Sequence, residues 1–232
     1  MRVFVACEES QRVCTAFRER GHEAYSCDVQ EPSGGHPEWH ILGYALLVLN
    51  PVERDVGFGD TSYSIRFVTM DGAVHQVPKW DLLIAHPPCT YLTSAGACRL
   101  FDAQHRIKDD DRAAKGWAAA GFFRRFLDAD CERICVENPA PMHYWNLPKY
   151  SQIIEPYQFG HPWKKRTCLW LKGLPPLVPT EIVKPTSCWV ETNGRTCRTK
   201  LRGEKGARSP KDRAKTFPGI ANAMAEQWGC MM

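Results

Sequence analysis

The sequence lacks the features that would indicate a membrane protein or a disulfide-stabilised secreted domain. No run of about 18 apolar residues is present, and the N-terminal MRVFVACEES is typical of a first strand and not of a secretory leader. The 11 cysteines are scattered, odd in number and without a C-x-x-C pair. We therefore expect a reduced cytoplasmic protein that has no membrane partner and binds no metal.

Acidic residues are scarce in one part of the chain. Residues 161–215 contain 14 Lys and Arg against 4 Asp and Glu, whereas the whole chain of 232 residues has a net charge of only +4. Charge segregation of this kind is typical of a polyanion-binding region on an otherwise acidic body. A solvated basic tail is the alternative, and we favour contact with nucleic acid.

Apolar periodicity predicts strands that alternate with helices. The expected strands are 2–6, 22–28, 80–85, 132–137 and 166–171, and the expected helices are 10–20, 104–127 and 217–228. Ser10 is a plausible N-cap of the first helix, and Trp117, Phe122, Phe123 and Phe126 are available for the core face of the second. Alternation around Asp71-Gly72 predicts a hairpin inserted at about 57–78. The pattern favours an α/β fold with a doubly wound, mostly parallel, Rossmann-like sheet.

Three reactive side chains follow predicted strands. Asp28, Cys89 and Glu137 each lie at or just after the end of a strand, and parallel sheets bind ligands at the carboxyl ends of their strands. In HPPC the two prolines stiffen the backbone that presents the Cys89 thiol. A carboxylate at Glu137 in an apolar setting would have a raised pKa, which suits proton sharing with a ring nitrogen. An inert buried cysteine and a helix-capping acid are the structural alternatives for these two residues.

The first loop lacks the glycines of a dinucleotide-binding fingerprint. It reads Ala6-Cys7-Glu8-Glu9-Ser10, and its two carboxylates would repel a pyrophosphate but not a cationic cofactor. Asp28, at the end of the second strand, stands where doubly wound folds often bind a ribose diol. These residues favour S-adenosylmethionine over NAD.

In combination these motifs resemble the DNA cytosine-C5 methyltransferases, most closely the short bacteriophage and prophage members. DLLIAHPPCTYLT is similar to the family's strand and Pro-Cys catalytic loop, and CVENP is similar to its Glu-Asn-Val segment. FGHPWKKRTCLWL stands where the family has a Gln-x-Arg-x-Arg strand, and FPGIANAMAEQWG resembles its C-terminal helix. The pair of Pro-Cys and Glu-Asn-Pro motifs, 48 residues apart, is more specific than either tripeptide alone.

The resemblance implies a class I S-adenosylmethionine-dependent methyltransferase acting on double-stranded DNA. Cys89 would add to C6 of a flipped cytosine, Glu137 would hold its N3 and N4 edge, and Lys165 or Arg166 would contact O2. Residues implied at the cofactor are Ala6, Cys7, Glu8, Glu9, Ser10, Asp28, His86, Pro87 and Asn222. A monomer is expected, in the bacterial host cytoplasm if the gene belongs to a phage.

The sequence departs from the family at several of these positions. The glycine-rich first loop is replaced by ACEESQ, and Thr90 stands where a Gln follows the catalytic Cys. In the Gln-x-Arg-x-Arg strand, Trp163 occupies the Gln place, Lys165 the first Arg place and Thr167 the second. Arg166 would replace an Arg only after a shift of one residue, so the choice between Lys165 and Arg166 is open.

We expect two regions, a catalytic domain of residues 1–171 plus 217–232 and a short basic target-recognition region at 172–216. The residues expected to contact DNA are Thr90, Lys200, Arg202, Lys205, Arg208, Lys211, Arg213 and Lys215. One alternative is a methyltransferase for exocyclic amino groups, in which HPPC with Tyr91 would form the loop and Cys89 would be incidental. Another is a decayed methyltransferase that binds DNA without chemistry.

Overall fold

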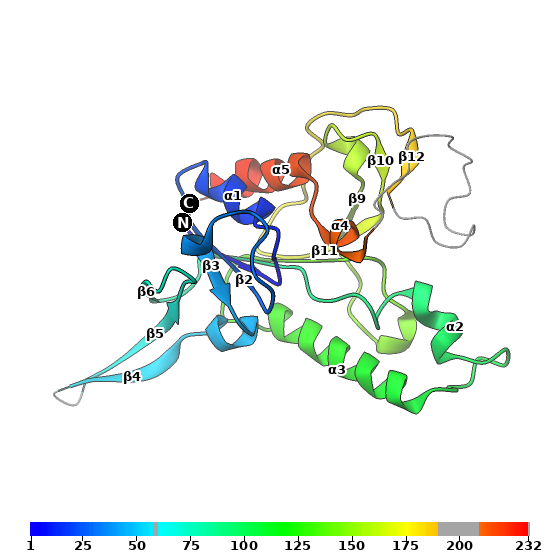
Figure 1. The fold of residues 1–232 in the computed structure, drawn as a ribbon, viewed down its shortest axis with the longest axis horizontal. Helices are drawn as coiled ribbons and strands as arrows, with labels where there is room; N and C mark the ends of the chain where they lie inside the picture. The colour runs from blue at the N-terminus through cyan, green and yellow to red at the C-terminus, as the bar shows by residue number, and fades with distance from the viewer. Residues whose placement is uncertain (58–59, 190–208, 232) are drawn as a thin grey trace.

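A seven-stranded sheet organises the part of the chain that the computed structural model describes, which is residues 1–57, 60–189 and 209–231 (Figure 1). Its strands, in spatial order, are β3 (His40–Leu42), β2 (Glu23–Asp28), β1 (Arg2–Ala6), β7 (Leu82–Ala85), β8 (Ile134–Asn138), β11 (Thr167–Lys172) and β9 (Gln152–Ile154). The remaining strands are β4 (Val52–Gly57), β5 (Asp60–Val68), β6 (Val74–Val77), β10 (Trp163–Lys164) and β12 (Ser187–Cys188). The α-helices are α1 (Arg12–Arg18), α2 (Ala97–Leu100), α3 (Asp110–Leu127), α4 (Pro210–Ala214) and α5 (Pro218–Gly229).

The direction of the strands confirms a mostly parallel α/β sheet. Strands β3, β2, β1, β7 and β8 pair in parallel, and β11 runs antiparallel to both β8 and β9. From β1 the chain builds the sheet outward through β2 to β3, and then returns to place β7 on the other side of β1. The carboxyl ends of β1 and β7 therefore lie where the order of strands reverses, which is where such sheets form a ligand crevice.

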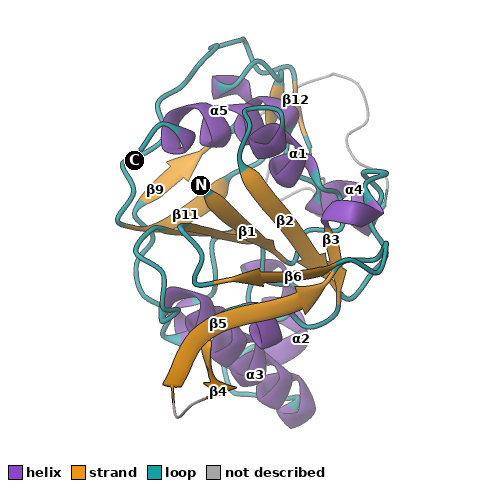
Figure 2. Ribbon diagram, turned by 90° about the vertical axis from the view of Figure 1, so that its left-hand side faces the viewer, coloured by secondary structure: helices purple, strands orange, loops and turns teal. Residues whose placement is uncertain are grey.

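Helices cover both faces of the sheet, with α1 and α5 on one face and α2 and α3 on the other (Figure 2). Successive strand residues point to opposite faces. Val3 and Val5 accordingly pack in a cluster with residues of α1 and α5, whereas Phe4 and Ala6 join the cluster that contains the buried side of α3. Burial on both faces explains why these strands are continuous apolar runs instead of alternating ones.

Two helix starts differ from the sequence-based expectation. The expected N-cap at Ser10 is wrong, because α1 begins after Gln11, whose φ of 56° lies in the left-handed region and whose side chain makes no cap hydrogen bond. The second helix begins at residue 110 and not near 104, because the Asp109 side chain accepts a hydrogen bond from Arg112 N at 2.8 Å and caps it there. Trp117 is 45% exposed, so its predicted place in the core is wrong, whereas Phe123 and Phe126 are fully buried.

The insertion between core elements is a three-stranded antiparallel sheet, β4-β5-β6, that projects from the body (Figure 1). The expected hairpin around Asp71-Gly72 is confirmed as the β5–β6 pair, with Val68 opposite Val74. The expected boundary at residue 57 is wrong, because β4 already starts at Val52 and pairs with β5.

The cysteines are mostly free, as the sequence predicts. Nine described cysteines are free thiols, but Cys188 is disulfide-bonded, so the expectation of a fully reduced chain is wrong at that position. No helix in residues 1–57, 60–189 or 209–231 combines the length and apolar character needed to cross a bilayer.

Candidate active site at the carboxyl edge of the sheet

The loop that bears Cys89 is held by a side-chain hydrogen bond from the neighbouring strand and by a backbone hydrogen bond within the loop. Strand β7 is completely buried and leads directly into His86-Pro87-Pro88-Cys89. Asn138, the last residue of β8, donates its side-chain N–H to Pro87 O at 2.7 Å. On the other side, Leu92 N donates to Cys89 O at 3.0 Å. These contacts fix the backbone on both sides of a half-buried thiol.

Glu137 and His86 form a buried ion pair beside this loop. His86 Nδ1 lies 2.8 Å from a Glu137 carboxylate oxygen, and each side chain is only 10% exposed. Burial raises the pKa of Glu137, but the hydrogen bond from His86 and the charges of Lys165 and His86 outweigh it and lower the pKa below its usual value. The expectation of a raised pKa at Glu137 is therefore wrong, because the sequence does not reveal the cation that faces it.

The same balance acts on His86 in the opposite direction. Burial lowers the pKa of His86, but the hydrogen bond and charge of Glu137 and the charge of Glu8 outweigh it, and the net pKa is raised. Both shifts favour the charged forms of the pair, an imidazolium beside a carboxylate. Both charges are removed from water, which makes each depend strongly on the other.

Lys165 faces this pair, whereas Arg166 does not. Lys165 lines a pocket together with Glu137, and its charge lowers the pKa of Glu137. Its backbone N–H donates to a Glu155 carboxylate oxygen at 2.8 Å, which fixes the chain just before β11. Arg166 is exposed, and its guanidinium reaches Tyr150 Oη at 3.5 Å. Of the two candidates that the sequence leaves open, the structure brings Lys165 to Glu137 and turns Arg166 to solvent.

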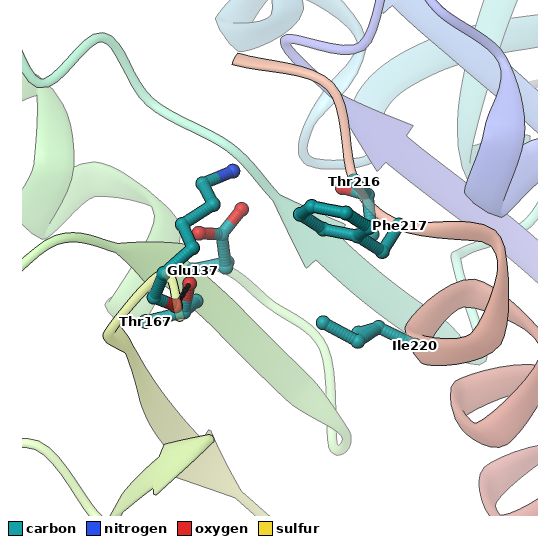
Figure 3. A pocket seen from close by; sticks show the side chains of 6 residues that line it. Glu137, Thr167, Thr216, Phe217 and Ile220 are labelled. Carbon is teal, nitrogen blue, oxygen red and sulfur yellow. Dashed lines mark hydrogen bonds between the residues drawn. The ribbon is translucent and has the colours of Figure 1, made fainter. Parts of the chain in front are cut away.

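The pocket beside Glu137 is closed on its far side by the start of α5. Its lining residues are Glu137, Lys165, Thr167, Thr216, Phe217 and Ile220. Phe217 and Ile220 lie across the pocket from Glu137 (Figure 3). The pocket has a volume of about 10 Å³, which is room for about one water molecule. Sequence reasoning missed Thr216 and Phe217, although the F-P-G start of the last helix, which resembles a family motif, was the available signal.

The Cys89 thiol is protonated in this conformation. Burial and the charge of Glu137 raise its pKa, and the charges of Lys165 and Arg213 lower it by less. A thiolate is the nucleophilic form of cysteine. Attack by Cys89 therefore requires either added positive charge or loss of the Glu137 charge next to it.

The first loop uses one of its two carboxylates for structure. Glu8 is 4% exposed and accepts hydrogen bonds from Val13 N at 2.7 Å and Cys14 N at 3.1 Å, so it caps α1 in place of Ser10. Both carboxylate oxygens of Glu8 therefore already have partners within the fold. Glu9 instead pairs with Lys211, whose Nζ lies 3.4 Å from a Glu9 carboxylate oxygen.

The other expected cofactor residues lie in different places. Asp28 is half-buried at the end of β2, and one carboxylate oxygen accepts a hydrogen bond from Gln30 N at 2.9 Å. Burial raises the pKa of Cys7, and the charge of Asp28 raises it further. Ser10 and Asn222 line a separate groove of about 440 Å³ between α1 and α5. Ala6 and Pro87 are buried, so they can offer a ligand only their backbone. The structure therefore does not gather all the expected cofactor residues into one pocket.

These residues are compatible with an adenosine cofactor. The Asp28 carboxylate is partly exposed, and one of its oxygens accepts a hydrogen bond from Gln30 N, so the other can accept one from a ribose hydroxyl. The groove that Ser10 and Asn222 line has the size of a small-molecule site. No group of three metal-binding side chains occurs among the described residues.

The expected DNA-contact residues are described only in part. Lys200, Arg202, Lys205 and Arg208 lie outside the described residues. Thr90 is exposed next to Cys89, and α4 presents Lys211 and Arg213 near the same edge of the sheet. Lys211 pairs with Glu9, and the charge of Arg213 acts on Cys89, so these cations belong to the site and are not a detached tail.

Comparison with known proteins identifies no relative of the chain. No family model matches the chain, and no curated protein matches it at a significant level.

Proposed function

We propose that the protein transfers a methyl group from S-adenosylmethionine to C5 of a cytosine that is flipped out of double-stranded DNA. The observation that supports this most is the grouping of three side chains from separate segments. Cys89 follows β7, Glu137 is the next-to-last residue of β8 and Lys165 precedes β11, and their charges act on one another. A nucleophile, a carboxylate and a cation in one place are what addition to a pyrimidine ring requires.

The chemistry assigned to these residues begins at Cys89. Its thiol loses its proton to water, and the sulfur forms a bond to C6 of the ring. The electron pair of the C5–C6 double bond moves into the ring, where a proton at N3, held by Glu137, balances the charge. Lys165 donates to O2 of the ring, where negative charge also develops.

The remaining steps restore the ring. S-adenosylmethionine, when bound, supplies the methyl group that C5 takes, and Asp28 would accept hydrogen bonds from its ribose. The proton on C5 then leaves to water, the bond between Cys89 and C6 breaks, and the N3 proton returns to the protein. The C5–C6 double bond is thereby restored, and Cys89 is free for a second cycle.

A base can enter only if the pocket widens. The volume of about 10 Å³ is far smaller than a pyrimidine, and the side across from Glu137 is formed by Phe217 and Ile220. A flipped base would therefore displace the segment that joins α4 to α5. That segment also holds Lys215, whose carbonyl accepts from Lys165 Nζ at 3.4 Å, so entry of a base would release Lys165 to contact it.

One observation favours a second candidate, methylation of an exocyclic amino group. Burial raises the pKa of Cys89, as it would for a cysteine without a catalytic role. In that reaction Cys89 makes no covalent bond, and the His-Pro-Pro loop would only position the amino group.

Expression in a host that lacks cytosine methylation tests both candidates. Bisulfite sequencing should reveal 5-methylcytosine with the wild type and with Cys98→Ser, an exposed cysteine away from the site, but not with Cys89→Ser. Methylation of an amino group that survives Cys89→Ser would establish the second candidate instead. Unmodified DNA from all three proteins would reject both.

A further inference from the structure

His86 differs from two other histidines in how its two ring nitrogens are used. His40 bonds Ser26 Oγ through Nδ1 at 2.8 Å and the Gln30 carbonyl through Nε2 at 3.0 Å. His75 likewise contacts Tyr25 Oη at 3.0 Å and Thr69 Oγ1 at 2.9 Å. In contrast, His86 contacts Glu137 through Nδ1, and its Nε2 is buried without a hydrogen-bond partner among the described residues.

A buried nitrogen without a partner costs stability, so this arrangement is not explained by folding alone. A histidine that only stabilises the fold would use both nitrogens, as His40 and His75 do. His86 is also placed at the carboxyl end of β7, three residues before Cys89, where the strand order reverses.

Charged groups from three other segments act on His86. Glu137 contacts it from β8, the charge of Glu8 reaches it from the loop after β1, and the charge of Lys165 opposes it from the segment before β11. Two carboxylates against one ammonium favour the imidazolium form. The hydrogen bond from His86 and the charges of Lys165 and His86 favour the ionised form of Glu137, so Glu137 has no proton of its own to give.

We propose that His86 stores the proton that Glu137 passes to N3 of the target base. The inference rests on the proposed function and adds to it the source of the proton. His86 is a positioning residue, since it acts through Glu137 and does not touch the base.

The transfer balances without another reactant. The Nδ1–H bond of His86 breaks as its proton passes to the Glu137 carboxylate, and the Glu137 proton passes to N3 as the sulfur of Cys89 bonds to C6. His86 is then neutral and Glu137 is again a carboxylate. When the bond between Cys89 and C6 breaks, N3 returns its proton through Glu137 to His86.

The first test is the titration of His86 itself, by nitrogen NMR of protein labelled at its eight histidines. The resonance is assigned by its loss in His86→Asn. We expect both ring nitrogens to remain protonated above about pH 6.5, the ordinary pKa of histidine, and the pKa to fall in Glu137→Gln. A His86 that titrates at or below the ordinary value would overturn the proposal, whether or not the protein methylates DNA.

The second test is the dependence of the single-turnover methylation rate on pH. In the wild type the rate should fall as pH rises through the pKa of His86. His86→Asn places an amide N–H near the position of Nδ1 but cannot store a proton, so it should lose this alkaline fall and be about 100-fold slower at neutral pH. His75→Asn is the matched control and should keep the wild-type pH profile.

An active His86→Asn variant that retains the alkaline fall refutes this inference and leaves the proposed function intact. If the wild-type protein has a raised His86 pKa but does not methylate DNA, the proposed function is refuted. The proposed passage of a proton to N3 is then refuted as well.

Discussion

The two edges of the central sheet use charged residues differently. At the amino edge, Arg2 and Asp81 satisfy each other, because Asp81 accepts from Arg2 N at 2.7 Å, from Nε at 3.2 Å and from Nη2 at 3.0 Å. At the carboxyl edge, His86 Nε2 and Asn138 Oδ1 are buried without a hydrogen-bond partner in residues 1–57, 60–189 and 209–231. A fully paired edge stabilises a fold, whereas an edge with unused polar atoms has capacity for a ligand.

The largest effect is expected at the carboxyl edge, with Glu137→Gln. The amide cannot carry a proton to N3, so about 2–4 kcal/mol of transition-state stabilisation should be lost, which is a reduction of roughly 30- to 1,000-fold in single-turnover rate. The thermal unfolding midpoint should also fall, since Gln preserves the shape of the side chain but leaves the buried His86 without its carboxylate partner. A nearly normal methylation rate in this variant would indicate that Glu137 has only a structural role.

A smaller loss is expected for Lys165→Met, with Arg166→Met as the matched control. Lys165 lines the pocket with Glu137, whereas Arg166 is exposed beside Tyr150. Removing the Lys165 charge should slow methylation about 100-fold, the lower end of the range for losing one donor to a developing negative charge. The methylation rate of Arg166→Met should stay within about 2-fold of the wild-type rate, a change too small to reflect a lost transition-state contact. The reverse order of the two effects would contradict the assignment of Lys165.

At the amino edge we expect an effect on stability alone. Asp81→Asn should lower the free energy of unfolding by about 1–2 kcal/mol at pH 7, since it weakens a partly exposed ion pair and a backbone hydrogen bond. Burial raises the pKa of Asp81, but its bonds to Arg2 outweigh this and lower it. The stabilisation is therefore present above the unfolded pKa of about 3.9 and is lost as pH falls through the lower folded pKa.

Denaturant titrations of the wild type and Asp81→Asn should thus converge as pH falls below about 4. Methylation should be unchanged by the substitution. A loss of activity without loss of stability would break the distinction between the two edges.

The smallest effect is expected on DNA affinity when a single lysine is removed, and we compare one lysine at each edge of the sheet. Lys211 lies on α4 near the carboxyl edge, whereas Lys172 ends β11 at the amino edge. Lys211→Ala should flatten the slope of the logarithm of DNA affinity against the logarithm of salt concentration by about one unit. Lys172→Ala should leave the slope unchanged. Equal slopes for the two variants would contradict the placement of the DNA at the carboxyl edge.

The sequence was sufficient for the framework because burial on both faces leaves a direct signature. The runs RVFVA, WDLLIA and ERICVE were predicted as strands and contain most of β1, β7 and β8, whose ends bring Cys89 and Glu137 to one edge. The element boundaries failed where a local hydrogen bond decides them. Capping by Glu8 moved the start of α1, and capping by Asp109 moved the start of α3.

The electrostatics of the site could not be predicted from the sequence. His86 and Glu137 are 51 residues apart, and their contact exists only because β7 and β8 are neighbours. The lowered pKa of Glu137 follows from that contact. The choice between Lys165 and Arg166 was equally hidden, because the short irregular stretch before β11 has no periodicity from which side-chain direction can be inferred.

The most direct test of the proposed function is covalent capture of the base. DNA that contains 5-fluorocytosine should trap the protein in the presence of S-adenosylmethionine, since fluorine cannot leave C5 as a proton does. Peptide mapping should locate the adduct on Cys89, and Cys89→Ser should form none. An adduct on Cys7, Cys98 or any other cysteine, or the absence of an adduct from an active wild-type protein, would contradict the assignment of Cys89 as the nucleophile.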